Sequence, residues 1–200
     1  MLNKKEIAMN RLLLTKIIFL ALILSLLGCS TKKPTYNLDP EFSLLQEQTN
    51  KSSVVAVKVI DNRQKTIELQ GNKQTVLSSS HKDAEVLQDK LISRLKQQGH
   101  KIINKPLLAD IAYEIELNRL SLTFETAMFK SEFAANSEIK LTVRRHSQHW
   151  TKIFRSSKTQ EVANPATDRD ATGIINQLLS QQLESAFSDN SLLEFLSKTQ

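Results

Sequence analysis

The sequence predicts an α+β fold: an antiparallel (mixed) β-sheet of about four to five strands with two main α-helices packed on one face, plus a short C-terminal helix. The run VVAVKVI, which begins at Val54, is β-branched and apolar, as a central strand is. From Ile111 onward apolar and polar residues alternate, as in a strand with one buried face. Two other segments repeat apolar residues at helical spacing. Because each element has one apolar side, helices on one face of the sheet bury all of these sides.

Short strands are predicted on both sides of the first helix. A strand or hairpin is expected across residues 66–77, where Gly71 and Asn72 supply turn residues. After the helix, residues 101–103 form a short return strand, and Pro106 ends it.

The first helix is predicted over residues 80–98. Ser80 and Asp83 have the spacing of a capping box at its start, and Gly99 follows its last turn as a stop signal. Apolar residues repeat along one face: Ala84, Leu87, Leu91 and Leu95, with Ile92 beside them.

The strand that starts at Ile111 changes its apolar phase partway along. Alternate residues are apolar up to Leu117, and the apolar set then moves by one position, starting at Leu120. Because side chains of a strand repeat every two residues, this change requires a bulge or a sharp twist near Asn118 and Arg119.

Two further strands and two helices complete the prediction. Apolar alternation around residues 139–143 and 150–154 predicts an antiparallel meander with a turn near Ser147 and Gln148. The second main helix starts after Pro165, with a capping box and one wide apolar face. Thr167 and Asp170 form the capping box. The apolar face consists of Ala171, Ile174, Ile175, Leu178, Leu179, Leu183, Ala186 and Phe187. Asp189 or Ser191 then caps a short terminal helix that carries Leu192, Leu193, Phe195 and Leu196.

The first 28 residues have the pattern of a signal peptide. Residues 1–16 carry a net positive charge, and the eleven residues 17–27 are apolar except for Ser25. A membrane-spanning helix needs roughly 20 apolar residues, and an extension back to Leu12 would place Lys16 in the membrane. The segment is therefore predicted to be a cleaved leader.

The junction Leu-Leu-Gly28-Cys29 resembles the lipobox of bacterial lipoproteins. The resemblance implies cleavage between Gly28 and Cys29 and a lipid on the sulfur of Cys29. The alternative is an ordinary cleaved signal followed by an unrelated cysteine. Cys29 is the only cysteine in the chain, so the mature domain has no disulfide. In that class Asp after the cysteine favours the inner membrane; because Ser30 stands there, we expect the periplasmic face of the outer membrane.

Three regions follow from these patterns. Residues 1–28 are the signal peptide, residues 29–53 are the lipidated N-terminus with a flexible polar tether, and residues 54–200 are a single α+β domain that faces the periplasm. Lys32 and Lys33 either contact anionic headgroups or are simply solvated.

Composition and motifs exclude several classes of function. The net charge is +6, and the leader holds four basic residues against one acidic residue, so only +3 remains for the mature chain. We therefore predict no nucleic-acid binding. Because the chain lacks the glycine-rich phosphate loops and the G-x-S-x-G elbow, we expect no cofactor and no enzyme activity.

A few residues are weak candidates for a site. Glu114 and Glu116 share a strand face, either as paired carboxylates or as the wet side of a half-buried sheet. The aromatic residues Tyr113, Trp150 and Phe154 either line a groove for a ligand or pack in the core. The four histidines are read as surface residues and no metal site is predicted: His81, His100, His146 and His149.

Taken together, these segments resemble the YajG-type family of uncharacterised Gram-negative lipoproteins. The resemblance is carried by LLGCS, VVAVKVI, VLQDKLISRLKQQGHKI, IAYEIELNRL and SDNSLLEFLSK, in this order along the chain. It implies an outer-membrane lipoprotein and brings no catalytic residues with it.

The leading hypothesis is a non-catalytic accessory module, anchored in the membrane through the lipid on Cys29. It binds another envelope protein through the sheet face or edge that the helices leave free. The alternative is a periplasmic carrier of small amphiphiles or cell-wall fragments, whose ligand would need a pocket of roughly 300 Å³ or more between helices and sheet. A cleft with clustered Glu, His and Ser would instead favour an enzyme.

Overall fold

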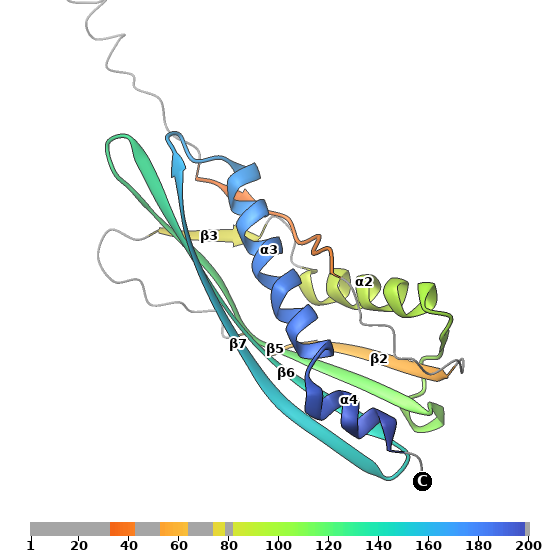
Figure 1. Cartoon of the computed structure of the whole chain (residues 1–200). Helices are drawn as coiled ribbons and strands as arrows, with labels where there is room; N and C mark the ends of the chain where they lie inside the picture. Colours follow the sequence, from red (N-terminus) through yellow and green to blue (C-terminus); the bar gives the residue numbers. More distant parts are fainter. Residues whose placement is uncertain (1–32, 43–52, 64–73, 79–81, 199–200) are drawn as a thin grey trace, which may run out of the picture. The chain divides into compact units, whose positions relative to one another are not determined.

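The computed structural model describes residues 33–42, 53–63, 74–78 and 82–198. The predicted signal peptide, the cleavage site at Gly28 and Cys29, and His81 lie outside these ranges. The elements, in chain order, are β1 Thr35–Tyr36, β2 Val54–Asp61, β3 Gln74–Ser78, α2 Asp83–Gln97, β4 Lys101–Ile102, the 3-10 helix η1 Pro106–Leu108, β5 Ile111–Thr126, β6 Lys130–Arg145, β7 Gln148–Ala163, α3 Asp168–Phe187 and α4 Asn190–Ser197 (Figure 1).

The sheet is built around a meander of three long strands. β5, β6 and β7 each have 16 residues and pair antiparallel in sequence order. The other side of β5 pairs with two strands, β2 in parallel along its first half and β3 antiparallel along its second half. The two-residue strands β4 and β1 extend β2 and β3 in parallel. The predicted mixed sheet is confirmed, with five strands of at least five residues.

The predicted bulge in β5 is confirmed. The register between β5 and β6 shifts between Leu117 and Arg119. The residues of both apolar phases are buried on the same side, from Ile111 to Leu117 and from Leu120 to Phe124. The extra residue thus lets one long strand keep all its apolar side chains in the core.

The helices cover one face of the sheet, as predicted (Figure 1). α2 packs on β2 with Leu87, Leu91 and Leu95, and α3 packs on β6 and β7. All eight apolar residues predicted for the inner face of α3 are buried. Within the described ranges, no helix has the length and hydrophobicity that a membrane span requires.

The predicted caps are confirmed at three helix ends and wrong at one. Thr167 and Asp170 form a capping box on α3, Asp189 caps α4, and Gly99 has a φ of 89° after α2. However, α2 starts at Asp83 rather than at residue 80, and the side chain of Lys82, in its N-cap position, does not cap the helix. The carboxylate of Asp83 is used in a buried ion pair described below.

The predicted tether is wrong for residues 33–42. The chain from Lys33 onward forms one compact unit, and Tyr36, Leu38 and Phe42 belong to its hydrophobic core. Residues 33–42 are called the N-terminal strap below. The folded domain therefore begins about twenty residues earlier than predicted, while residues 29–32 and 43–52 of the predicted tether lie outside the described ranges.

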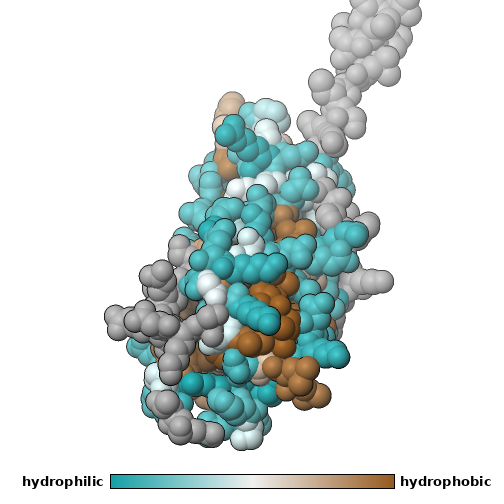
Figure 2. All heavy atoms as spheres, turned by 90° about the vertical axis from the view of Figure 1, so that its right-hand side faces the viewer, coloured by the Kyte–Doolittle hydropathy of each residue, from teal (hydrophilic) through white to brown (hydrophobic). Residues whose placement is uncertain are grey.

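A few large hydrophobic side chains remain exposed on the domain. Leu107 and Leu108 in η1 are 88% and 70% exposed, and Met128 and Phe129 in the β5–β6 turn are 84% and 82% exposed. Figure 2 shows one face of the molecule, on which hydrophobic surface gathers in the lower half between hydrophilic residues.

Candidate functional site

The strap occupies the space between α2 and α3 on the covered face of the sheet. Its residues alternate, so that Tyr36, Leu38 and Phe42 are buried while Asn37, Asp39 and Glu41 are left for polar contacts. The two residues of β1 pair in parallel with the last two residues of β3. The strap thus closes the region in which a carrier would hold an apolar ligand.

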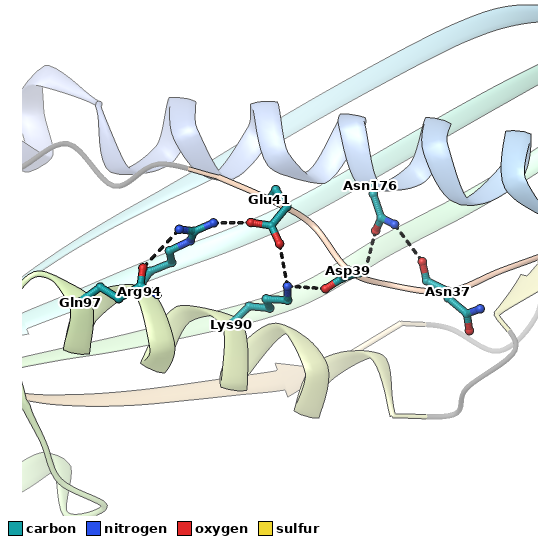
Figure 3. Close-up of polar contacts among 7 residues, drawn as sticks. All are labelled: Asn37, Asp39, Glu41, Lys90, Arg94, Gln97 and Asn176. Atoms are coloured by element: carbon teal, nitrogen blue, oxygen red, sulfur yellow. Dashed lines mark hydrogen bonds and ion pairs between the residues drawn. The ribbon is translucent and has the colours of Figure 1, made fainter.

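Polar contacts join the strap to α3 on one side (Figure 3). The backbone N–H of Asp39 donates to Oδ1 of Asn176 at 2.8 Å, and Nδ2 of Asn176 donates to the carbonyl of Asn37 at 2.9 Å. At the start of the strap, the N–H of Thr35 donates to Oδ1 of Asp168 at 2.7 Å. These contacts fix the backbone of the strap along the first half of α3.

Ion pairs join the strap to α2 on the other side (Figure 3). Nζ of Lys90 lies 2.9 Å from Oε1 of Glu41 and also pairs with Asp39, and Arg94 pairs with Glu41. The hydrogen bond from Lys90 lowers the pKa of Glu41. Exposed ion pairs contribute little to stability, because water screens them and the long side chains lose entropy. The buried side chains of the strap therefore supply most of its binding energy, and the charged pairs set its position.

A buried ion pair lies beside the strap. Asp83 is 1% exposed, and its carboxylate accepts from Nη1 of Arg63 at 2.8 Å and from the hydroxyl of Ser78 at 2.7 Å. Arg63 also pairs with Asp61 at 2.6 Å, which lowers the pKa of Asp61. This cluster ties the ends of β2 and β3 to the start of α2. The sequence pattern predicted only a helix-capping role for Asp83 and gave no sign of this cluster.

The cluster also affects Tyr36 of the strap. Burial, together with the charge of Asp83, raises the pKa of the Tyr36 phenol to about 12. In the unfolded chain a tyrosine titrates near pH 10. The folded state therefore keeps its proton where the unfolded state loses it, so stability is fully present below about pH 10 and is lost as the pH rises toward about 12.

Tyr36→Phe tests this linkage. We expect the wild-type free energy of unfolding to fall between pH 10 and pH 12, and we expect a smaller fall in the variant, because phenylalanine has no proton to lose. Urea unfolding followed by circular dichroism at a series of pH values measures both slopes. Equal slopes for the two proteins would exclude Tyr36 as the titrating group.

A small polar hollow lies at the bulge of β5. It has a volume of about 190 Å³ and is lined by Arg119, Asn136, Ser137, Glu138, Arg155, Ser156 and Ser157. Nε of Arg155 donates to Oε2 of Glu138 at 2.7 Å, which lowers the pKa of this carboxyl. Pockets for small ligands are usually larger, from about 300 Å³, and mostly apolar. The hollow therefore does not favour the carrier hypothesis.

β7 forms an edge of the sheet, and the outer side of this long strand is unpaired in the described domain. β7 pairs with β6 along all 16 residues, and no described strand pairs with its other side. Most of its side chains are exposed, and those of residues 150, 154, 156, 158 and 162 are partly covered. An unpaired edge presents backbone donors and acceptors to which an extended segment of another chain can add.

The predicted aromatic candidates pack in or against the core. Tyr113 is buried, with its ring centroid 5.6 Å from that of Phe187. Trp150 and Phe154 on β7 are half-buried, 6.4 Å apart by their centroids, and Nε1 of Trp150 donates to Oγ of Ser191. These contacts attach α4 to β7 and support core packing rather than a ligand groove.

The described carboxylates and histidines that the sequence offered as candidates do not come together in one site. Glu116 accepts from Nζ of Lys140 at 2.6 Å, while Glu114 lies 3.7 Å from Lys58, so each carboxylate pairs with its own cation on the open face of the sheet. His146, in the β6–β7 turn, has a positive φ of 53°. Among the described residues, no group of three or more metal-ligating side chains could hold an ion.

Comparisons with known proteins give a family and several distant structural neighbours. The model of a family described as "Uncharacterized lipoprotein" matches residues 40–197, which is more than half of the chain. No curated protein matches the chain.

The structural neighbours include bacterial proteins of low sequence identity. Protein XCC0632 from Xanthomonas campestris is 13% identical, with a TM-score of 0.48 over 81% of this chain and 97% of the other. Rare lipoprotein B from Shewanella oneidensis is 14% identical, with a TM-score of 0.35 over 71% and 94%. Lipoprotein GNA1162 from Neisseria meningitidis is 8% identical, with a TM-score of 0.34 over 68% and 98%.

Proposed function

Because the chain belongs to the family described as uncharacterized lipoproteins, we propose that it is a non-catalytic module, anchored to the outer membrane by a lipid on Cys29, that binds another envelope protein at the β7 edge. The lipobox-like junction at Gly28 and Cys29 supports the site of the lipid, and Ser30 supports the outer membrane. Residues 28–30 lie outside the described ranges, so this part of the proposal rests on the sequence.

The observation that carries the binding role is the length of the free edge of β7. Proteins usually shorten, twist or cover an edge strand, because a long one recruits other strands. Here 16 residues pair on one side only. The strap lies between α2 and α3 on the covered face, and its side chains Tyr36, Leu38 and Phe42 belong to the hydrophobic core. The β7 edge is therefore the best-supported docking surface for a partner of extended conformation.

The absence of catalysis is part of the same proposal. The carboxylates that the sequence places together, Glu114 and Glu116, are each neutralised by a lysine. The hollow at the bulge holds a paired glutamate and arginine rather than a free acid and base. Neither arrangement provides the nucleophile and base within hydrogen-bond distance that nucleophilic catalysis requires.

Site-specific photocrosslinking in intact cells tests the docking surface. A photoreactive amino acid is placed at the exposed positions Ser157 and Thr159 of β7 and, as a matched control, at the exposed position Gln177 of α3. We expect a discrete crosslinked product, identified by mass spectrometry, from both β7 positions and not from the α3 position. Products at background level from β7, or the same products from all three positions, would refute docking at this edge.

A further inference from the structure

The turn between β5 and β6 exposes two adjacent large apolar side chains. Met128 and Phe129 are 84% and 82% exposed, although the strands that lead to the turn bury one face along their length. A backbone hydrogen bond closes the turn: the N–H of Ala127 donates to the carbonyl of Lys130 at 2.8 Å. Two adjacent apolar side chains exposed on a hydrogen-bonded turn favour contact with an apolar surface.

Hydrogen bonds connect this turn to the segment that precedes α3. Nδ2 of Asn164 donates to the carbonyl of Ala127 at 2.5 Å, and the N–H of Asn164 donates to the carbonyl of Phe129 at 3.4 Å. The hydroxyl of Ser131 donates to Oδ1 of Asn164 at 2.6 Å. The position of the turn is thus fixed relative to the start of α3, four residues later at Asp168.

The N-terminal strap starts at the same end of the domain. The N–H of Thr35 donates to Asp168, the first residue of α3. In Figure 1 the orange start of the strap, the start of α3 and the β5–β6 turn lie together at one end of the domain. Cys29 stands four positions before Lys33, and four residue steps span at most about 14 Å. A lipid on Cys29 therefore keeps this end of the domain close to the bilayer.

We propose that the β5–β6 turn is a second membrane contact, in which Met128 and Phe129 insert into the lipid interface. The inference rests on the proposed lipidation of Cys29. Apolar side chains gain free energy when they leave water for the lipid interface. The anchor supplies the proximity, and the turn supplies the orientation: the β5–β6 end faces the lipid, and the rest of β7 extends into the periplasm.

The opposite end of the domain provides a matched control. β6 runs from Lys130 to Arg145, a distance of at most about 50 Å at the rise of a strand. At its far end Arg144 contacts the carbonyl of Pro106, which places η1 there. Leu107 of η1 is as exposed as Phe129. It therefore differs from Phe129 in its distance from the anchor and not in its accessibility.

The test uses the lipidated full-length mature protein in vesicles of phosphatidylethanolamine and phosphatidylglycerol. Single Phe129→Cys and Leu107→Cys variants are labelled with an environment-sensitive fluorophore; the sulfur of Cys29 carries the lipid and does not react. We expect the emission at position 129 to shift to the blue and to be quenched by spin-labelled lipids. The probe at position 107 is expected to show neither effect. Met128→Cys repeats the measurement at the neighbouring position.

Flotation of the same samples separates the two proposals. If the protein floats with the vesicles but the probe at position 129 resembles that at position 107, the turn is not a membrane contact and the inference is wrong. If the protein does not float, the anchor fails and the inference fails with it. Quenching at positions 128 and 129 in floated protein supports both.

Discussion

Replacing Arg63 with alanine is expected to lower the free energy of unfolding by about 3–5 kcal/mol, because the substitution leaves a buried carboxylate without its cation. The carboxylate belongs to Asp83, which is 1% exposed and 2.8 Å from the guanidinium. The hydroxyl of Ser78 remains as a hydrogen-bond donor, but a hydroxyl supplies no charge. Urea unfolding of the variant and the wild type measures the difference.

The double variant Arg63→Ala/Asp83→Ala is the control for this mechanism. If the unpaired charge causes the loss, removal of the carboxylate restores part of the stability, and the effects of the two single variants do not add. A loss below about 1 kcal/mol in Arg63→Ala would place this pair among ordinary surface ion pairs and contradict the buried pair.

Replacing Phe133 with alanine is expected to cost about 3–5 kcal/mol of stability, because it removes a large, fully buried side chain from the core. Phe133 lies on β6, is completely buried, and its ring centroid is 5.8 Å from that of Phe124 on β5. β6 pairs with β5 on one side and with β7 on the other, so the cavity has little opportunity to collapse.

Phe129→Ala provides a control with the same change of residue four positions earlier. Phe129 is 82% exposed, so its removal is expected to change stability by no more than about 0.5 kcal/mol. Denaturant unfolding of both variants without membranes compares the two sites. Equal losses would contradict the burial assigned to Phe133, and a large loss at Phe129 would show that the turn supports the fold rather than a membrane contact.

The sheet and the helices were predictable because their signals are local. The change of apolar phase in β5 is contained in a few consecutive residues, and side chains that repeat every two residues leave a bulge as its direct consequence. The capping box at Thr167 and Asp170 and the turn at Gly99 are likewise signals within four residues. The match to the lipoprotein family confirms the family resemblance that the order of these segments suggested.

The strap was not predicted, because its partners lie far away in the sequence. Tyr36, Leu38, Pro40 and Phe42 alternate with polar residues, which is a signal of one buried face. The run is short and contains prolines, so its polar composition suggested a tether. The groove that receives it exists only after α2 and α3 have packed on the sheet, and periodicity within the strap does not show this groove.

The buried pair of Arg63 and Asp83 was not predictable from the sequence for a similar reason. Asp83 stands where a capping residue was expected, and local spacing gave it that role alone. Its actual partner is 20 residues away, and the intervening chain includes β3.

The β7 edge was predicted only as a free sheet edge in general, because the sequence pattern does not reveal the order of strands in a sheet.

Both proposals depend on residue 29 being the point at which the chain is fixed to the membrane. Mass spectrometry of the mature protein, isolated from cells grown with a labelled fatty acid, tests this directly. We expect a chain that begins at Cys29 and carries the labelled acyl groups, and a Cys29→Ala variant without label. A wild-type chain that still begins at Met1, or an unmodified residue 29, would contradict it.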